Sequence, residues 1–139
     1  LEELAHLKHS NGNPIVKIYG PLENTQRGGT ITLNFFDPNN HFIDQQIVEE
    51  RANARLISLR TGCFCNPGGG EIALGLTKNE ITTCFHKHPV MEYLDFKRCI
   101  DDKSTGAVRI SVGLVSTFED VSRLVDFVAE FRDRQANEI

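Results

Sequence analysis

The stretch AVRISVGL, residues 107–114, constrains the fold more than any other part of the chain. Apolar residues occupy alternate positions: Val108, Ile110, Val112 and Leu114. This period of two predicts a strand with one buried face and with Arg109 and Ser111 on the other. Directly after it, Ser116 and Glu119 match the S-x-x-E capping box of a helix. The helix has one apolar stripe, which predicts that it packs on the sheet: Val121, Leu124, Val125, Val128 and Phe131.

Other segments complete a predicted element order of ββαβααβα. Strands are expected at 15–19, 28–36 and 56–62, an amphipathic helix at 44–55 and a turn at 37–40 (DPNN). Helical segments are expected over 71–100, with Pro89 as a first-turn residue or a break. We therefore expect an α+β fold, a mostly antiparallel sheet with helices packed on one face. The length of 139 residues fits a single domain, 1–139.

Composition excludes several classes of function. A net charge of −4 gives no basic surface for nucleic acid, and no apolar run approaches the ~20 residues that span a membrane. The N-terminus lacks the features of a signal peptide, so we expect a cytoplasmic protein. It also lacks an initiating Met, which indicates a processed product or an excised fragment. Four cysteines are too few for a disulfide scaffold and are interpreted as reduced thiols.

The stretch RTGCFCNPGGGE, residues 60–71, places two cysteines before a run that is expected to form a loop. Three interpretations of the cysteines compete. Burial as small apolar residues suits Cys84 and Cys99 best. A zinc site is disfavoured because no C-x2-C spacing occurs among the available ligands: Cys63, Cys65, Cys84, His86 and His88. The third interpretation is a nucleophile, since a thiolate on a Gly-rich loop is accessible and the cation of Arg60 favours its charged form.

The motif itself resembles the signature of molybdenum-cofactor sulfurases, which are class V aminotransferase-like, fold-type I pyridoxal-phosphate enzymes. Four further stretches resemble the C-terminal region of that family, in the same order: HSNGNPIVKIYGP, RGGTITLNFFDP, VEERAN and GAVRISVGLVSTFEDVSRLVDF. The resemblance covers most of the chain, and residues 77–104 are its least diagnostic part. More distantly, the R-[ST]-G-x-x-C loop of cysteine desulfurases matches Arg60, Thr61, Gly62 and Cys65.

The resemblance implies sulfur transfer from L-cysteine. Cys65 is the implied catalytic residue, which takes the substrate sulfur as a persulfide and delivers it to molybdenum cofactor or a similar acceptor. Arg109 stands in the V-R-x-S motif whose arginine binds the substrate carboxylate in the family, and a guanidinium suits this role because its planar fork makes two parallel hydrogen bonds. The alternative is a surface salt bridge. Residues expected to support the loop are Arg60, Thr61, Gly62, Cys63, Asn66 and Gly68.

The chain also departs from the family pattern. Gly70 stands where the sulfurase loop often has a third cysteine, and the Schiff-base lysine of the family lies in a large domain upstream; Lys87 is interpreted as an exposed lysine instead. The implied protein is a homodimer that holds pyridoxal phosphate in that domain, and the chain alone is expected to be colourless and inactive, without cofactor or metal ligands. His9 is expected to form a turn. The alternative function is a non-enzymatic sulfur-carrier, metal-binding or scaffold module that keeps the fold.

Overall fold

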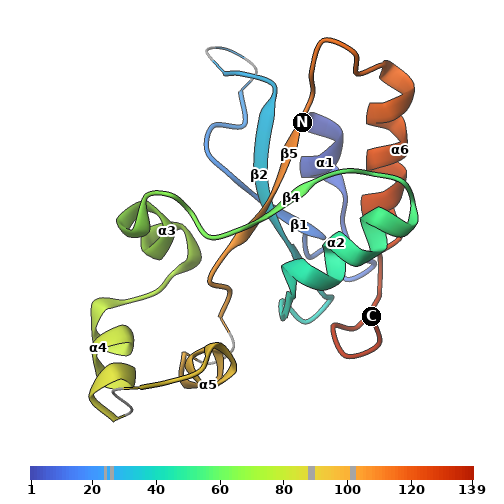
Figure 1. Cartoon of the computed structure of the whole chain (residues 1–139). Coiled ribbons are helices and arrows are strands. Elements are labelled where there is room, and N and C mark those ends of the chain that lie inside the picture. The colour runs from blue at the N-terminus through green and yellow to red at the C-terminus, as the bar shows by residue number, and fades with distance from the viewer. Residues whose placement is uncertain (24, 26, 88–89, 101–102) are drawn as a thin grey trace. The chain divides into compact units, whose positions relative to one another are not determined.

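The computed structural model describes residues 1–23, 25, 27–87, 90–100 and 103–139, which form two compact units (Figure 1). The first comprises Leu1–Thr61 and Ala107–Ile139 and contains the β-sheet; we call it the sheet unit. The second comprises Gly62–Gly106 and is called the helical unit. The α+β class with a mostly antiparallel sheet, predicted from the sequence, is confirmed.

The described sheet contains β1 (Val16–Tyr19), β2 (Thr30–Phe36), β3 (Phe42–Ile43), β4 (Arg60–Gly62) and β5 (Ala107–Ser111). Its strand order is β1-β2-β5-β4, and β3 also pairs with β2. β2 runs antiparallel to β1, β3 and β5, with Leu33 opposite both Ile18 and Val108. Because side chains alternate along a strand, the apolar residues of β1, β2 and β5 line up on one face of the sheet.

Helices α1 (Glu2–His6), α2 (Gln45–Ala54) and α6 (Phe118–Ala129) contribute to the core on that face. α1 and α6 lie side by side in Figure 1. Phe35 of β2 packs against Phe127 and Phe131, with ring centroids 6.3 and 4.7 Å apart. Burial of each such side chain contributes about 1.5–3 kcal/mol. The core residues named from the stripe of the C-terminal helix are confirmed for three positions: Leu124, Val128 and Phe131.

His9 joins the start and the end of the sheet unit. Its side chain is fully buried, and its Nδ1 accepts a hydrogen bond from the backbone N–H of Asp133 at 2.9 Å. The other nitrogen, Nε2, must then carry the proton that it donates to the carbonyl of Phe36 at 3.0 Å. The turn predicted at His9 is confirmed, because the N–H of Gly12 donates to the His9 carbonyl.

The turn predicted at 37–40 is confirmed and is organised by the buried Asp37. The backbone N–H groups of Asn39 and His41 each donate to its Oδ1 at 2.8 Å. Burial alone would raise the pKa of Asp37, but the hydrogen bonds from His41, Ala136 and Asn39 outweigh it and hold the pKa below its usual value. The carboxylate is therefore charged and part of the fold near neutral pH.

The helical unit contains α3 (Pro67–Leu74), α4 (Lys78–Lys87) and α5 (Tyr93–Cys99). Helical structure over 71–100 is thus confirmed in kind, while the predicted break at Pro89 lies outside the described residues. The prediction that PGGG forms a loop is wrong, because it opens α3. Proline at the first helical position lacks only a donor that has no helical partner there, and Asn66 caps the turn. No described helix is long and apolar enough to cross a bilayer.

The interpretation of all four cysteines as reduced thiols is wrong for one pair. Cys84 of α4 and Cys99 of α5 form a disulfide, with Cα atoms 5.9 Å apart. That separation lies in the ordinary range for a bridge, and α4 and α5 bring it about by packing on each other. Burial of Cys84 is confirmed, at 1% exposure, but as half of a disulfide.

The predicted strand at 107–114 is too long by three residues. β5 ends at Ser111, and Val112 and Leu114 are 50% and 107% exposed. The chain turns there because the Gly113 N–H donates to Ser116 Oγ and the Ser116 N–H donates to the Gly113 carbonyl. Since Ser116 is used in this turn, the predicted capping box at Ser116 and Glu119 is wrong by one residue.

The observed capping box joins Thr117 and Asp120, whose side chains bond to each other's backbone N–H groups. The strand predicted at 56–62 is reduced to β4, since Leu56 takes a left-handed conformation, φ 56°, where α2 ends. The short elements α1 and β3 were not predicted, because five and two residues carry too little periodicity to detect.

Candidate functional site

The cysteine loop leaves the sheet from β4, which is hydrogen-bonded to β5, the strand of Arg109. Thr61 fixes this exit: its Oγ1 donates to Glu49 Oε2 of α2 at 2.6 Å. Gly62 follows with φ 140°, a conformation that side-chain-bearing residues rarely adopt. Arg60, on the other side of Thr61, is exposed. Thr61 and Gly62 thus anchor and turn the chain ahead of the two cysteines.

Cys63 and Cys65 are both free and exposed on the loop that follows. Phe64 between them is half-buried and lies on Gly70 of α3. A Cβ added at Gly70 would meet the Phe64 Cβ at 3.1 Å and ring carbons at 3.3 and 3.4 Å. The glycine at the position of the family's third cysteine therefore lets Phe64 pack closely on the helix while the two thiols face solvent.

Asn66 begins α3 directly after Cys65. Its Oδ1 accepts a hydrogen bond from the Gly69 N–H at 3.1 Å, and its carbonyl accepts one from the Gly70 N–H at 2.9 Å. Gly68 lies in the same exposed first turn. Cys65 thus precedes a capped helix N-terminus, where the backbone dipoles favour an anion.

Arg109 lies in the sheet unit, on the face of β5 opposite the core. Its neighbours Val108 and Ile110 are buried whereas Arg109 is exposed, as predicted from the alternation. Within the described part of the chain, no hydrogen bond or ion pair holds its guanidinium. Arg109 lies on the strand that is hydrogen-bonded to β4, which carries Arg60 and Thr61, whereas Cys63, Cys65, Asn66 and Gly68 belong to the helical unit.

Tyr19 shares the polar sheet face with Arg109, and no sequence motif marked it as a candidate site residue. Thr32 of β2 stands opposite Arg109 on one side and Tyr19 on the other. Burial raises the pKa of Tyr19. A hydrogen bond from Asn34 Nδ2 to the Tyr19 hydroxyl, 3.1 Å long, lowers the pKa, but by less. Lys17 Nζ lies 5.3 Å from the centre of the Tyr19 ring. This face therefore offers two cations and a protonated phenol.

The remaining candidate groups are metal ligands and lysines. No group of three or more His, Cys, Asp or Glu side chains gathers in them, Cys84 is bound in its disulfide, and His88 lies outside them. Of the lysines whose side chains are described, each is at least partly exposed, and Lys103 bonds Glu80 at 2.5 Å and the Gly75 carbonyl at 3.0 Å. The side chain of Lys87 lies outside the described residues.

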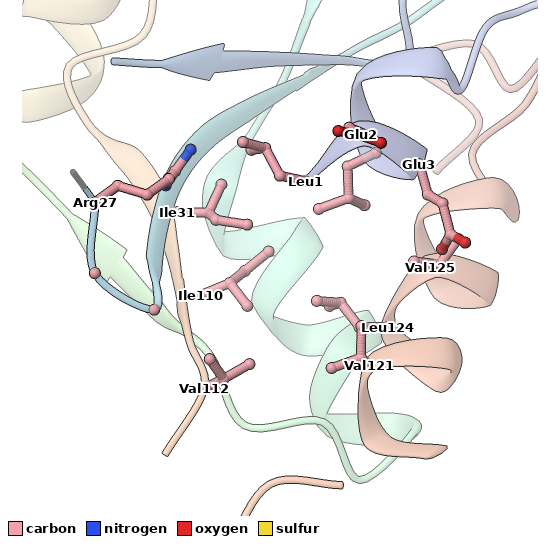
Figure 2. Close-up of a pocket in the computed structure, with 13 residues that line it drawn as sticks. Leu1, Glu2, Glu3, Arg27, Ile31, Ile110, Val112, Val121, Leu124 and Val125 are labelled. Atoms are coloured by element: carbon pink, nitrogen blue, oxygen red, sulfur yellow. The ribbon is translucent and has the colours of Figure 1, made fainter. Parts of the chain in front are cut away.

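An apolar groove of about 430 Å³ lies elsewhere in the sheet unit (Figure 2). Apolar side chains from the N-terminus, β2, β5 and α6 line it, with Glu2, Glu3 and Arg27 also at the groove. It contains neither Cys63, Cys65 nor Arg109, so it is separate from the predicted site residues. The apolar lining is Leu1, Leu4, Ile31, Ile110, Val112, Val121, Leu124 and Val125.

The fold and the loop define an α+β domain that presents a pair of free cysteines between an anchored strand end and a capped helix. Comparison with known proteins identifies its relatives. The chain is 38% identical over 126 residues to molybdenum cofactor sulfurase of Solanum lycopersicum, covering 91% of this chain and 15% of that protein. It is 36% identical over 131 residues to the Arabidopsis thaliana protein of that name, with 91% and 16% covered, and 35% identical over 133 residues to the Homo sapiens one, with 93% and 15% covered.

The resemblance found in the sequence is thereby confirmed: the chain is related, over about nine tenths of its length, to molybdenum cofactor sulfurases. It spans only about 15% of the length of these relatives. No protein-family model matches the chain, and no solved structure matches it significantly.

Proposed function

We propose that this chain is the small domain that carries the catalytic loop of a pyridoxal-phosphate-dependent sulfurtransferase. Cys65 would take sulfur from L-cysteine as a persulfide, with release of alanine, and pass it to molybdenum cofactor or a similar acceptor. The observation that carries the proposal is the free, exposed Cys65 in the matched loop motif, directly before a capped helix N-terminus. An accessible thiol there can meet first a substrate and then an acceptor.

Arg109 would bind the carboxylate of the substrate cysteine. It is exposed, and its strand is hydrogen-bonded to the strand that leads into the loop. Cys65 follows Gly62, the end of β4, by three residues, which span at most roughly 11 Å. Chain connectivity thus keeps the thiol within reach of the edge of the sheet, whatever conformation the loop adopts. The Tyr19 hydroxyl and Lys17 on the same face would add to its preference for an anion.

The cofactor would be held by a large domain upstream of this chain, as the resemblance implies. When bound, pyridoxal phosphate supplies an electron sink for the substrate. This chain would supply the thiol, the carboxylate-binding cation and the loop whose ends are fixed by Thr61 and Asn66. In the proposed assembly, an upstream large domain and a second subunit complete the enzyme, and the chain alone is inactive.

Release of alanine from L-cysteine by the full-length protein tests the proposal. Cys65→Ala is expected to abolish it, because no other side chain can take the sulfur at that position. Cys63→Ala, a matched change of an exposed thiol two residues away, is expected to leave most of it. Alanine release at the wild-type rate in both variants would show that neither thiol is the nucleophile.

A further inference from the structure

All four cysteines of the chain lie within its described residues, and they fall into two pairs. Cys84 and Cys99 are joined in a disulfide, whereas Cys63 and Cys65 are free and exposed. A sulfur atom carried by Cys65 therefore has one free thiol of this chain available as a reaction partner. That thiol, Cys63, is only two residues away along the same loop.

The structure keeps both thiols accessible. Phe64, the residue between them, is held by its contact with Gly70, and neither cysteine is buried in that contact. Both lie after β4 and before α3, outside the sheet and the helices. The loop is anchored at its two ends, by Thr61 and Asn66.

Chain geometry permits a bond between the two sulfur atoms. Two residues of fully extended chain separate the Cα atoms of Cys63 and Cys65 by about 6.6–7.2 Å, at or just beyond the upper limit of about 6.8 Å for a disulfide. A modest bend shortens this distance into the ordinary range. The backbone already bends at Cys65 and Asn66.

We propose that Cys63 is the resolving thiol of this loop. When Cys65 carries a persulfide and no acceptor takes its outer sulfur, the Cys63 thiolate attacks the Sγ of Cys65. A Cys63–Cys65 disulfide forms, the bond between the two persulfide sulfur atoms breaks, and the outer sulfur leaves as hydrosulfide. Cys63 is oxidised and the leaving sulfur is reduced, so the persulfide itself is the oxidant; the proton of the Cys63 thiol passes to solvent.

This inference rests on the proposed function in taking Cys65 as the sulfur carrier. It adds a second outcome for the bound sulfur, release as hydrosulfide, which competes with transfer to the acceptor. The loop then stays in a disulfide form until an external thiol reduces it by exchange. Cys63 would thus limit how long an unused persulfide persists on the protein.

The test loads the thiols chemically, so that it does not depend on enzyme activity. The protein, with Cys63 and Cys65 reduced, is treated with one equivalent of inorganic polysulfide and quenched at intervals with iodoacetamide. The peptide containing residues 63–65 is then analysed by mass spectrometry, and the released hydrosulfide is measured. In the wild type, a persulfide at Cys65 should give way to an intrapeptide disulfide, with release of one further equivalent of hydrosulfide beyond that formed during loading. In Cys63→Ser the persulfide should last at least about ten times longer.

Cys65→Ser is the matched control and should form no intrapeptide disulfide. Equal persulfide lifetimes in the wild type and Cys63→Ser would overturn the proposal, as would migration of the extra sulfur to Cys63 without hydrosulfide release. If the full-length protein made no persulfide from L-cysteine, the proposed function would fail while the chemical-loading result would still decide the role of Cys63. The two failures are therefore distinguishable.

Discussion

Replacing Thr61 by valine removes one hydroxyl, keeps the shape of the side chain, and so tests how the cysteine loop is anchored. Thr61 Oγ1 donates to the carboxylate of Glu49 at 2.6 Å, and both residues are half-buried. A hydrogen bond to a charged group contributes about 1.5–3 kcal/mol, and partial exposure screens it toward the lower end. We expect Thr61→Val to lower the free energy of unfolding by about 1–2 kcal/mol, a factor of roughly 5–30 in the folding equilibrium.

Urea unfolding of the chain measures this loss. Thr61→Ser keeps the hydroxyl and is the control, expected within about 0.5 kcal/mol of the wild type. A double-mutant cycle of Thr61→Val with Glu49→Gln should give a coupling energy of about 1 kcal/mol, the size expected for residues in contact. If valine and serine at position 61 were equally stable, or the coupling were zero within error, the hydrogen bond would not anchor the loop.

Three further predictions concern the disulfide, acid stability and substrate binding. Replacing Cys84 and Cys99 together by serine should lower stability by about 3 kcal/mol for a loop of this length; thiol titration of the folded chain should find two thiols before reduction, and four would contradict the bridge. Hydrogen bonds hold the pKa of Asp37 in the folded protein below its usual value. The charged carboxylate therefore contributes its full stabilisation of the fold above the pKa of the unfolded chain, about 3.9, and this contribution is lost as the pH falls through the folded-state pKa. Asp37→Asn should therefore reduce the loss of stability between about pH 5 and about pH 3, and an unchanged loss would refute this. In the full-length enzyme, Arg109→Lys and Arg109→Ala should both weaken the apparent affinity for L-cysteine by several kcal/mol, because each lost charge-assisted hydrogen bond is worth about 1.5–3 kcal/mol. Near-normal affinity in both variants would make Arg109 a structural residue.

Periodic segments of the chain could be predicted because one face of each is buried. The strands at β1, β2 and β5 and the helices α2 and α6 follow this rule. The residues at which elements begin and end depend instead on which of several possible local hydrogen bonds forms. Ser116-x-x-Glu119 and Thr117-x-x-Asp120 overlap in the sequence, and only the bond of Ser116 to the Gly113 turn decides between them.

The exposure of the cysteine loop and the outward orientation of Arg109, both parts of the candidate site, could also be predicted from the sequence. Contacts between distant residues were not. The bond of Thr61 to Glu49 joins residues twelve positions apart, and the bridge from Cys84 to Cys99 depends on the packing of α4 on α5. The number of cysteines alone could not reveal which of them meet.

The location of the transferred sulfur tests the central claim most directly. The full-length protein would be incubated with L-cysteine, alkylated after one turnover, and digested, and the peptide containing Cys63 and Cys65 would be fragmented in the mass spectrometer. The account predicts one additional sulfur atom on Cys65 and none on Cys63. An additional sulfur found only on Cys63, or release of alanine with neither an additional sulfur on Cys65 nor a Cys63–Cys65 disulfide, would contradict it.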